Sequence, residues 1–214
     1  MSPAEENGHP DSALDEAEEP LEHTLDPEVA ARRSAALAHV RTFGDLVLRT
    51  RASEVKSFDE ALRTEIERMA YLMSEALGVG LAATQLGVMH RVLVYRTSVD
   101  APLVAVVNPE FDWSSAEQEE AEEACLSLPG VAVDVERSLH VRVRARDETG
   151  EEMVIEASGL EARVIQHEVD HLDGVLILDR TSREQRKEAL RVLREGLESP
   201  SPPGEPTQIS QASG

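Results

Sequence analysis

One stretch of the sequence, His167-Glu168-Val169-Asp170-His171, has the residue types and spacing of a metal site. Residues four apart in a helix lie on the same face, so both imidazoles can bind one ion. Glu168 lies beside them, where a carboxylate can exchange a proton with a reacting group. The pattern alone leaves an alternative open, which is a pair of exposed histidines on an amphipathic helix.

A third metal ligand is needed, because a catalytic divalent ion usually has three protein ligands and one open position. No histidine follows His171, and the acidic residues after it match no known ligand spacing. The single cysteine, Cys125, is a candidate, since a thiolate binds iron(II) and zinc strongly. A lone cysteine is more often a small buried apolar residue, so the residue type alone does not decide.

The segment from Gly78 to Gln85 combines two glycines, two alanines and a glutamine amide. Small residues let another backbone approach closely, and the amide can donate a hydrogen bond. The segment lacks the Lys and Ser/Thr of a phosphate-binding loop, so it does not indicate nucleotide binding. Its other interpretation is a turn of small residues packed against the core.

Three helices are expected to position these residues. Apolar residues at helical spacing predict a helix over 58–77, with a capping box of Ser57 and Glu60 before it and Gly78 at its end. A second helix is predicted over about 160–173 and carries both histidines. A third follows the capping box of Ser182 and Gln185, with an apolar stripe made by Ala189, Leu190, Leu193 and Leu197.

Strands are predicted where β-branched residues form short runs bounded by turn residues, namely Arg91 to Arg96, Leu103 to Val107, Leu139 to Arg146 and Met153 to Ala157. The third of these alternates apolar and polar residues and is expected to be half-exposed. The order of helix, strands, helix and helix indicates an α+β fold. We expect mostly antiparallel strands packed around the central helix that bears the two histidines, followed by a C-terminal helix.

Charge and composition separate the ends of the chain from its middle. The 214 residues include 42 acidic and 21 basic ones, a net charge of −21, but residues 29–197 carry only −9. Residues 1–28 hold ten carboxylates and no Lys or Arg, and residues 198–214 are rich in Pro and Ser. We therefore expect one domain over 29–197, an acidic disordered tail over 1–28 and a Pro/Ser-rich disordered tail over 198–214.

The same composition bears on location and partners. Aromatic residues make up 3% of the chain, so base stacking has little support and no sequence-specific nucleic acid is expected. No segment approaches the roughly 18 consecutive apolar residues that span a bilayer, so no membrane span is expected. A single cysteine cannot form an intramolecular disulfide, and no signal peptide is evident, so a cytoplasmic location fits best.

Taken together, the three segments resemble the peptide deformylase family. The family motifs are Gly-x-Gly-x-Ala-Ala-x-Gln, Glu-Gly-Cys-x-Ser and Gln-His-Glu-x-Asp-His-Leu. The matching segments occur here in the same order, as Gly78 to Gln85, Glu123 to Ser127 and Gln166 to Gly174. The resemblance covers about residues 44–197, and three ordered motifs are far more specific than any one of them.

The resemblance implies a metal-dependent hydrolase that removes the N-formyl group from formyl-methionine on newly made polypeptides, giving formate and a free amine. Cys125, His167 and His171 would bind one divalent ion, natively iron(II), with zinc, nickel or cobalt as substitutes. A water at the fourth position would lose its proton to Glu168, the general base and acid. The Gln85 amide and the Leu126 N–H would be the oxyanion donors.

The resemblance also implies a substrate site. The peptide backbone would pair like an added strand near Gly80. Val79 and Val164 would line the methionine pocket, although both could be ordinary core valines. Glu123 and Arg137 are predicted to form an ion pair that steadies the loop of the cysteine, with two solvated surface charges as the alternative.

Two features depart from the family pattern. Ala124 replaces the glycine of the second motif, which would reshape the site if that position needs a positive φ or close backbone approach. The acidic stretch Glu117 to Glu123 is predicted to be solvated charge. The alternatives to a deformylase are a deformylase-like protein that binds metal or peptide with little turnover, and a zincin-type endopeptidase.

The third predicted helix carries five basic residues, which are Arg183, Arg186, Lys187, Arg191 and Arg194. In the family such a helix can dock on the ribosome near the exit tunnel, where phosphates attract cations. Acidic residues interleave with these bases at i, i+4 spacing, so a plain salt-bridged helix is the competing interpretation.

Overall fold

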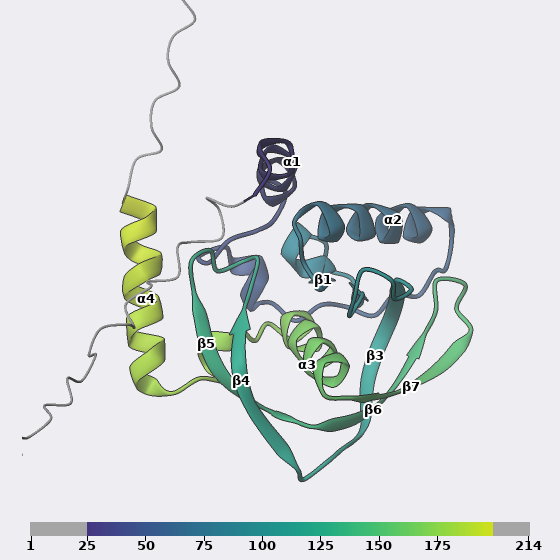
Figure 1. Ribbon diagram of the computed structural model, residues 1–214. Helices are drawn as coiled ribbons and strands as arrows, with labels where there is room; N and C mark the ends of the chain where they lie inside the picture. Colours follow the sequence, from purple (N-terminus) through teal and green to yellow (C-terminus); the bar gives the residue numbers. More distant parts are fainter. Residues whose placement is uncertain (1–24, 199–214) are drawn as a thin grey trace, which may run out of the picture.

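Two antiparallel sheets enclose one buried helix in the computed structural model, which describes residues 25–198 (Figure 1). The larger sheet has the strand order β1-β2-β3-β6-β7. Its strands are β1 Gly80–Ala82, β2 Val92–Tyr95, β3 Val104–Ser114, β6 His140–Arg146 and β7 Glu152–Ser158. The smaller sheet pairs β4 Gln118–Ala124 with β5 Ala132–Ser138. The α+β fold with antiparallel strands is confirmed.

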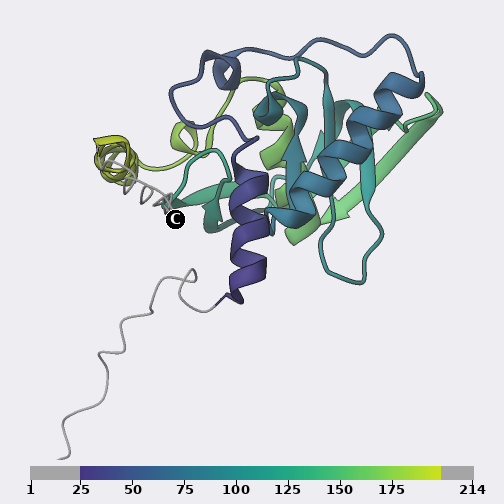
Figure 2. The ribbon, with the colours of Figure 1, turned by 90° about the horizontal axis from the view of Figure 1, so that it is seen from above.

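Helix α3, Leu160–Leu172, lies between the two sheets and contacts β1, β2, β5 and β7. Helix α2, Glu60–Glu75, covers β1 and β2, and α1, Pro27–Leu37, packs on α2. Figure 2 shows α1 beside the C-terminal end of α2. Helix α4, Arg183–Glu198, lies at one edge of the molecule, so that α1 is between α4 and α2 in this view. Short 3-10 helices, η2 Leu46–Arg49, η3 Ala83–Leu86 and η4 Ile177–Asp179, connect these elements.

Helix α2 forms where the apolar spacing predicts it, and its buried face includes Leu62, Ile66, Met69 and Met73. The predicted ends are wrong in detail. The N-cap is Asp59 instead of the box of Ser57 and Glu60, since its carboxylate accepts from the N–H groups of Ala61 and Leu62 at 3.1 and 3.2 Å. At the other end Leu77, with φ of +60°, takes the left-handed position that was expected at Gly78. The Gly78 N–H then bonds the Met73 carbonyl, as in a Schellman ending.

Helix α3 confirms the predicted helix over 160–173, and glycines bound it. Gly159 and Gly174 have positive φ values of +58° and +74°. A Cβ on Gly174 would also lie 2.7 Å from the carbonyl carbon of Arg49, so no other residue fits there without a backbone shift. This close contact brings the segment after the second histidine against the loop before α2.

The four predicted strands are confirmed as β2, β3, β6 and β7, and β6 has the expected half-exposed alternation. Strands β1, β4 and β5 were not predicted. The acidic stretch before Cys125 is β4, which pairs with β5 in the register Glu123 to Val133. Its other acidic side chains are exposed, but Glu123 is 6% exposed. The prediction of solvated charge is therefore wrong for Glu123.

The predicted disordered tails, 1–28 and 198–214, fall mostly on residues 1–24 and 199–214, which lie outside the described residues. The first boundary is wrong by at least two residues, because α1 begins at Pro27. Asp26 caps this helix by accepting from the Glu28 N–H at 2.8 Å, and Pro27 suits the first helical position. No helix within residues 25–198 combines the length and apolar character needed to cross a membrane.

Candidate metal centre

The three predicted metal ligands lie together although they come from two separate elements. Cys125 directly follows β4, and His167 and His171 lie one turn apart on α3. Their ligand atoms all lie within 4.8 Å of one another, and Cys125 Sγ is 3.1 Å from His171 Nε2. The two imidazole rings meet edge to face with centroids 5.0 Å apart. One thiolate and two imidazoles form a donor set that suits iron(II) or zinc.

The surroundings of the two histidines suit an ion in different ways. His171 is 2% exposed, and this burial lowers its pKa well below the ordinary value, so the ring is neutral and able to bind a metal. Its Nδ1 is a buried atom without a hydrogen-bond partner among the described residues. Burial alone would lower the pKa of His167, but Cys125 and Glu123 outweigh it and raise that pKa well above its ordinary value. The site around His167 therefore favours a cation.

Glu123 holds His167 in place. Its Oε2 lies 2.9 Å from His167 Nδ1, which leaves Nε2 of that ring for a metal. Its oxygens also accept from Arg137 Nε and Nη2, both at 2.9 Å, so the predicted pair of Glu123 and Arg137 is confirmed. Burial would raise the pKa of Glu123, but the hydrogen bonds from His167 and Arg137 lower it to about 2. Glu123 is thus a buried carboxylate at neutral pH.

Three further charged residues complete this network and were missed from the sequence. Arg163, four residues before His167 on α3, donates to Glu123 at 2.9 Å and to the carbonyls of β4 and β5. Asp170 accepts from Arg137, and Arg180 bonds the same carboxylate at 2.6 and 3.1 Å. The i, i+4 spacing of Arg163 and His167 was the one available signal, since it places both side chains on the same face of the helix.

Glu168 lies against the backbone of Gly80. It is 4% exposed, and its Oε2 has no hydrogen-bond partner among the described residues. Burial raises the pKa of Glu168 to about 7. A Cβ built on Gly80 would lie 2.9 Å from both Cγ and Cδ of Glu168. The carboxyl group can occupy this position only because residue 80 has no side chain.

Gln85 lies on η3 beside the cysteine and is 2% exposed. Its Oε1 accepts from the Ala82 N–H at 2.9 Å, which fixes the orientation of the amide. Its Nε2 donates to Ser127 Oγ at 3.1 Å and lies 3.7 Å from Cys125 Sγ. The amide nitrogen is thus aimed at the loop that carries the cysteine.

These groups open onto a cleft of about 710 Å³. Eight of the predicted site residues line it, and these are Val79, Gly80, Gln85, Cys125, Leu126, Val164, His167 and Glu168. Val79 is 48% exposed and also lines the cleft, so the alternative that it is a core valine is wrong. Val164 is 5% exposed and belongs to a core cluster as well as to the cleft wall.

The substitution at Ala124 causes no backbone strain. Among the described residues other than glycine, only Leu77 and Asn108 have positive φ, so Ala124 has an ordinary extended conformation. It ends β4 opposite Ala132, and its exposed side chain lines the cleft. A cluster of one cysteine and two histidines, next to a buried carboxyl group in an open cleft, is the arrangement of a metal-dependent hydrolase.

Comparison with known proteins narrows this class to one family. The family model described as "Polypeptide deformylase" matches residues 37–187. The "Peptide deformylase" of Acidothermus cellulolyticus is 48% identical over 160 residues, which cover 75% of this chain and 87% of that protein. The "Peptide deformylase" of Thermotoga neapolitana is 52% identical over 141 residues, covering 66% of this chain and 85% of that protein.

Solved structures that resemble this fold belong to the same family. The crystal structure of a peptide deformylase from Synechococcus elongatus in complex with actinonin superposes with a TM-score of 0.70 at 40% identity, covering 73% of this chain and 86% of that chain. The peptide deformylase from Thermotoga maritima gives a TM-score of 0.64 at 49% identity, covering 67% and 96%. The chain belongs to the peptide deformylase family. It is a metal-dependent hydrolase of protein biosynthesis that removes N-terminal formyl groups.

Proposed function

We propose that Cys125, His167 and His171 hold one divalent ion and that Glu168, Gln85 and Leu126 carry the hydrolysis of N-terminal formyl-methionine. The observation that supports this most is the meeting of the three ligand atoms within 4.8 Å, beside a carboxyl group whose pKa is about 7. Iron(II) is the proposed native ion, with zinc, nickel or cobalt able to replace it. When bound, such an ion supplies Lewis acidity that activates water at neutral pH.

Glu168 is proposed to take a proton from the attacking water and to deliver one to the leaving amine. A raised pKa suits both directions of transfer, because a carboxyl group that binds its proton more tightly than usual is a better base and can return the proton to the amine. The approach of Gly80 fixes where the carboxyl group lies. Formate and the free amine of methionine are the products, and the atoms of one water are consumed.

Gln85 and Leu126 are proposed to stabilise the negative charge that develops on the formyl oxygen. The bond from the Ala82 N–H to Oε1 leaves the Gln85 nitrogen as the donor on the side of Cys125 and Ser127. The N–H of Leu126, the residue after the cysteine ligand, is the second donor. Preorganised donors of this kind need no reorientation during the reaction, which is the source of their effect.

The proposed substrate is the formylated end of a nascent polypeptide. Strand β1 pairs on one side with β2 and is the edge strand of its sheet, so a peptide backbone can pair near Gly80. Val79 and Val164 are proposed to contact the methionine side chain. We place the reaction in the cytoplasm, with no role for a membrane or for sequence-specific binding to nucleic acid.

Docking near the ribosomal exit tunnel through the basic residues of α4 is a second proposal, and a helix whose charges pair only with one another is its alternative. Arg191 bonds Glu188 and Glu195 within the helix, as a salt-bridged surface helix does. Pelleting with ribosomes at low salt tests it. Docking predicts that the double variant Arg183→Glu, Lys187→Glu pellets less than the wild type, and equal pelleting would contradict it.

Metal retention tests the ligand set directly. The full chain is loaded anaerobically with iron(II), passed through a desalting column and assayed for bound metal. We expect one ion per chain in the wild type and in the control His90→Ala, whose histidine is exposed beside Glu65. Cys125→Ala and His167→Ala are expected to lose most of the metal. Full retention by Cys125→Ala would contradict the proposal and favour a site made by the histidines alone.

A further inference from the structure

Helix α1 forms part of the cleft although it lies outside the family match. The family model begins at residue 37, where α1, Pro27–Leu37, ends. Three residues of this N-terminal segment nevertheless line the same cleft as the metal ligands, and these are Leu25, Arg33 and Leu37. The chain therefore carries an additional wall next to the site.

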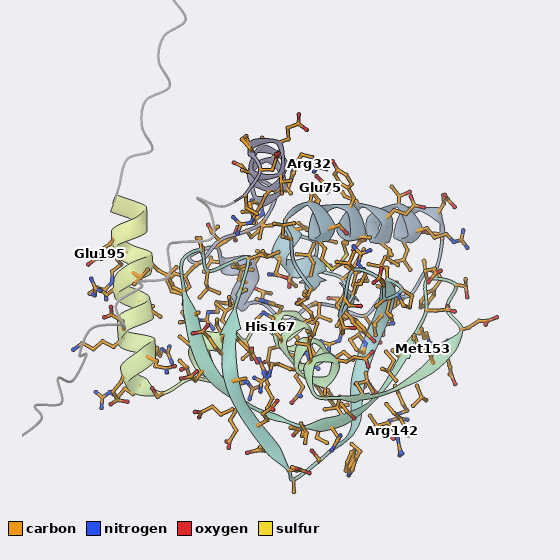
Figure 3. The ribbon with its side chains drawn as sticks, in the orientation of Figure 1. Arg32, Glu75, Arg142, Met153, His167 and Glu195 are labelled. Atoms are coloured by element: carbon orange, nitrogen blue, oxygen red, sulfur yellow. The ribbon has the colours of Figure 1, made fainter. Side chains whose placement is uncertain are left out.

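Packing against α2 places the helix in this position. Ala36, in the last turn of α1, and Val40, just after the helix, are 3% and 7% exposed. Both belong to the core cluster that contains the buried face of α2. Arg32 reaches Glu75 at the end of α2, with the charged atoms 3.8 Å apart (Figure 3). Arg33 and Leu37 are four residues apart and therefore share one side of the helix, the side that lines the cleft.

The cleft differs in character along its length. Near the metal ligands it is lined by Glu122, Glu123 and Glu168. Toward α1 it is lined by apolar side chains that include Leu37 and Leu77, and Leu77 is 54% exposed. Large exposed apolar side chains gathered in a cleft indicate a surface that a ligand covers. Arg33 adds a cation to this outer part.

The size of the cleft fits more than formyl-methionine. A cleft of about 710 Å³ is in the range that holds a ligand of drug size, and formyl-methionine is smaller than that. Each further residue of an extended peptide advances by about 3.3 Å, so a few residues after methionine extend well away from the metal ligands. The occupant of the outer part is then the same peptide, continued past its first residue.

We propose that α1 contacts the residues that follow formyl-methionine and that Arg33 makes the enzyme favour acidic side chains there. The inference deepens the proposed function and rests on it, because that function sets the direction of the peptide in the cleft. Arg33 acts here as a specificity residue and takes no part in the chemistry. Its expected effect is on kcat/KM for long substrates and not on the reaction of short ones.

The test uses three substrates and four forms of the full chain. The substrates are formyl-Met-Ala, formyl-Met-Ala-Ser-Asp-Asp and formyl-Met-Ala-Ser-Lys-Lys, and the last two differ only in the charge of their outer residues. The proteins are the wild type, Arg33→Glu, Arg33→Gln and the control Arg32→Glu. The control makes the same change of net charge on the same helix, but at a residue that contacts Glu75 instead of lining the cleft.

The proposal predicts that the wild type prefers the acidic over the basic peptide. The ratio of kcat/KM for the acidic peptide to kcat/KM for the basic peptide is expected to fall about fivefold or more in Arg33→Glu, because the attraction between residue 33 and the acidic side chains becomes a repulsion. In Arg33→Gln, which only removes the attraction, the ratio should fall less. Formyl-Met-Ala should be hydrolysed equally by the wild type and by Arg32→Glu, whose substituted residue does not line the cleft. An equal ratio in Arg33→Glu and Arg32→Glu would overturn the role of Arg33. Loss of formyl-Met-Ala turnover in the wild type would instead overturn the proposed function.

Discussion

Gly80 and Glu168 lie so close that a methyl group on residue 80 would overlap the carboxyl group of Glu168, with 2.9 Å to its Cδ. The absence of a side chain at Gly80 therefore helps to position Glu168, the proposed proton carrier. The burial that raises the pKa of Glu168 to about 7 depends on the same contact, because Gly80 covers one side of the carboxyl group.

Gly80→Ala tests this relationship. The added methyl group must displace Glu168, and a misplacement of about 1 Å can cost about 10²-fold in rate. We expect a loss of that order in kcat/KM for formyl-Met-Ala, with the bound metal retained. The control is Gly196→Ala on α4, where a Cβ meets no atom within 4 Å. Unchanged kcat/KM in Gly80→Ala would show that the close approach has no role in the reaction.

Glu123→Gln is expected to weaken both the fold and the metal site. Arg137 and Arg163, 5% and 8% exposed, would lose the carboxylate that they share, although Arg137 keeps Asp170, and breaking a buried pair this way costs about 3–5 kcal/mol. The loss of the bond to His167 should lower metal affinity about 10–100-fold. Urea unfolding and metal titration measure the two effects.

The matched control for Glu123 is Glu120→Gln, an exposed glutamate on the same strand that faces Glu136 across the hairpin. It should change neither unfolding nor metal affinity. If Glu123→Gln behaved like this control, the buried network would not support the ligand histidine.

Gln85→Ala addresses the proposed oxyanion donor. Removing one such donor typically lowers kcat by about 10²–10³. We expect that loss with little change in KM, because the amide acts on charge that appears only in the transition state. Stopped assays with formyl-Met-Ala give both constants, and Gln118→Ala on the exposed start of β4 is the control. A loss confined to KM would assign Gln85 to substrate binding instead.

Asp179 makes the stability of the fold depend on pH. Partial burial would raise its pKa, but the Leu176 N–H at 2.9 Å and Arg49 outweigh this and lower it below 3.8. The carboxylate therefore stabilises the folded state above pH 3.8, and this contribution is lost as the pH falls through the lowered pKa.

Urea unfolding of the wild type and Asp179→Asn between pH 6 and pH 3 measures this contribution. The difference in unfolding free energy between the two proteins should be largest at pH 6 and shrink toward pH 3. The control is Asp100→Asn in the exposed loop after β2. A difference that stays constant with pH would contradict the assignment to Asp179.

The parts of the site that could be predicted depend on local spacing. His167, Glu168 and His171 follow from one helical repeat, and α3 occurs where that repeat places it. Cys125 could be assigned only through the resemblance, since nothing in its local sequence separates a ligand thiol from a buried one.

The parts that could not be predicted depend on tertiary contacts. Strand β4 has a sequence that disfavours strands, and it forms because β5 pairs with it and Arg163 binds its carbonyls. Asp170 lies within the metal motif, but its partners Arg137 and Arg180 lie outside the helix that carries it, on β5 and in the turn after η4. Leu77 has the positive φ that residue type alone would place at the following glycine, Gly78, because packing at the end of α2 fixes this conformation.

The central claim is that these residues hydrolyse formyl-methionine with Glu168 as the proton carrier. Its most direct test is anaerobic, iron(II)-loaded turnover of formyl-Met-Ala, following the new amine, in the wild type and in Glu168→Ala. We predict turnover in the wild type and a loss of at least about 10²-fold in the variant, with equal bound metal in both. Absence of turnover in the metal-loaded wild type, or equal turnover in the variant, would contradict the account.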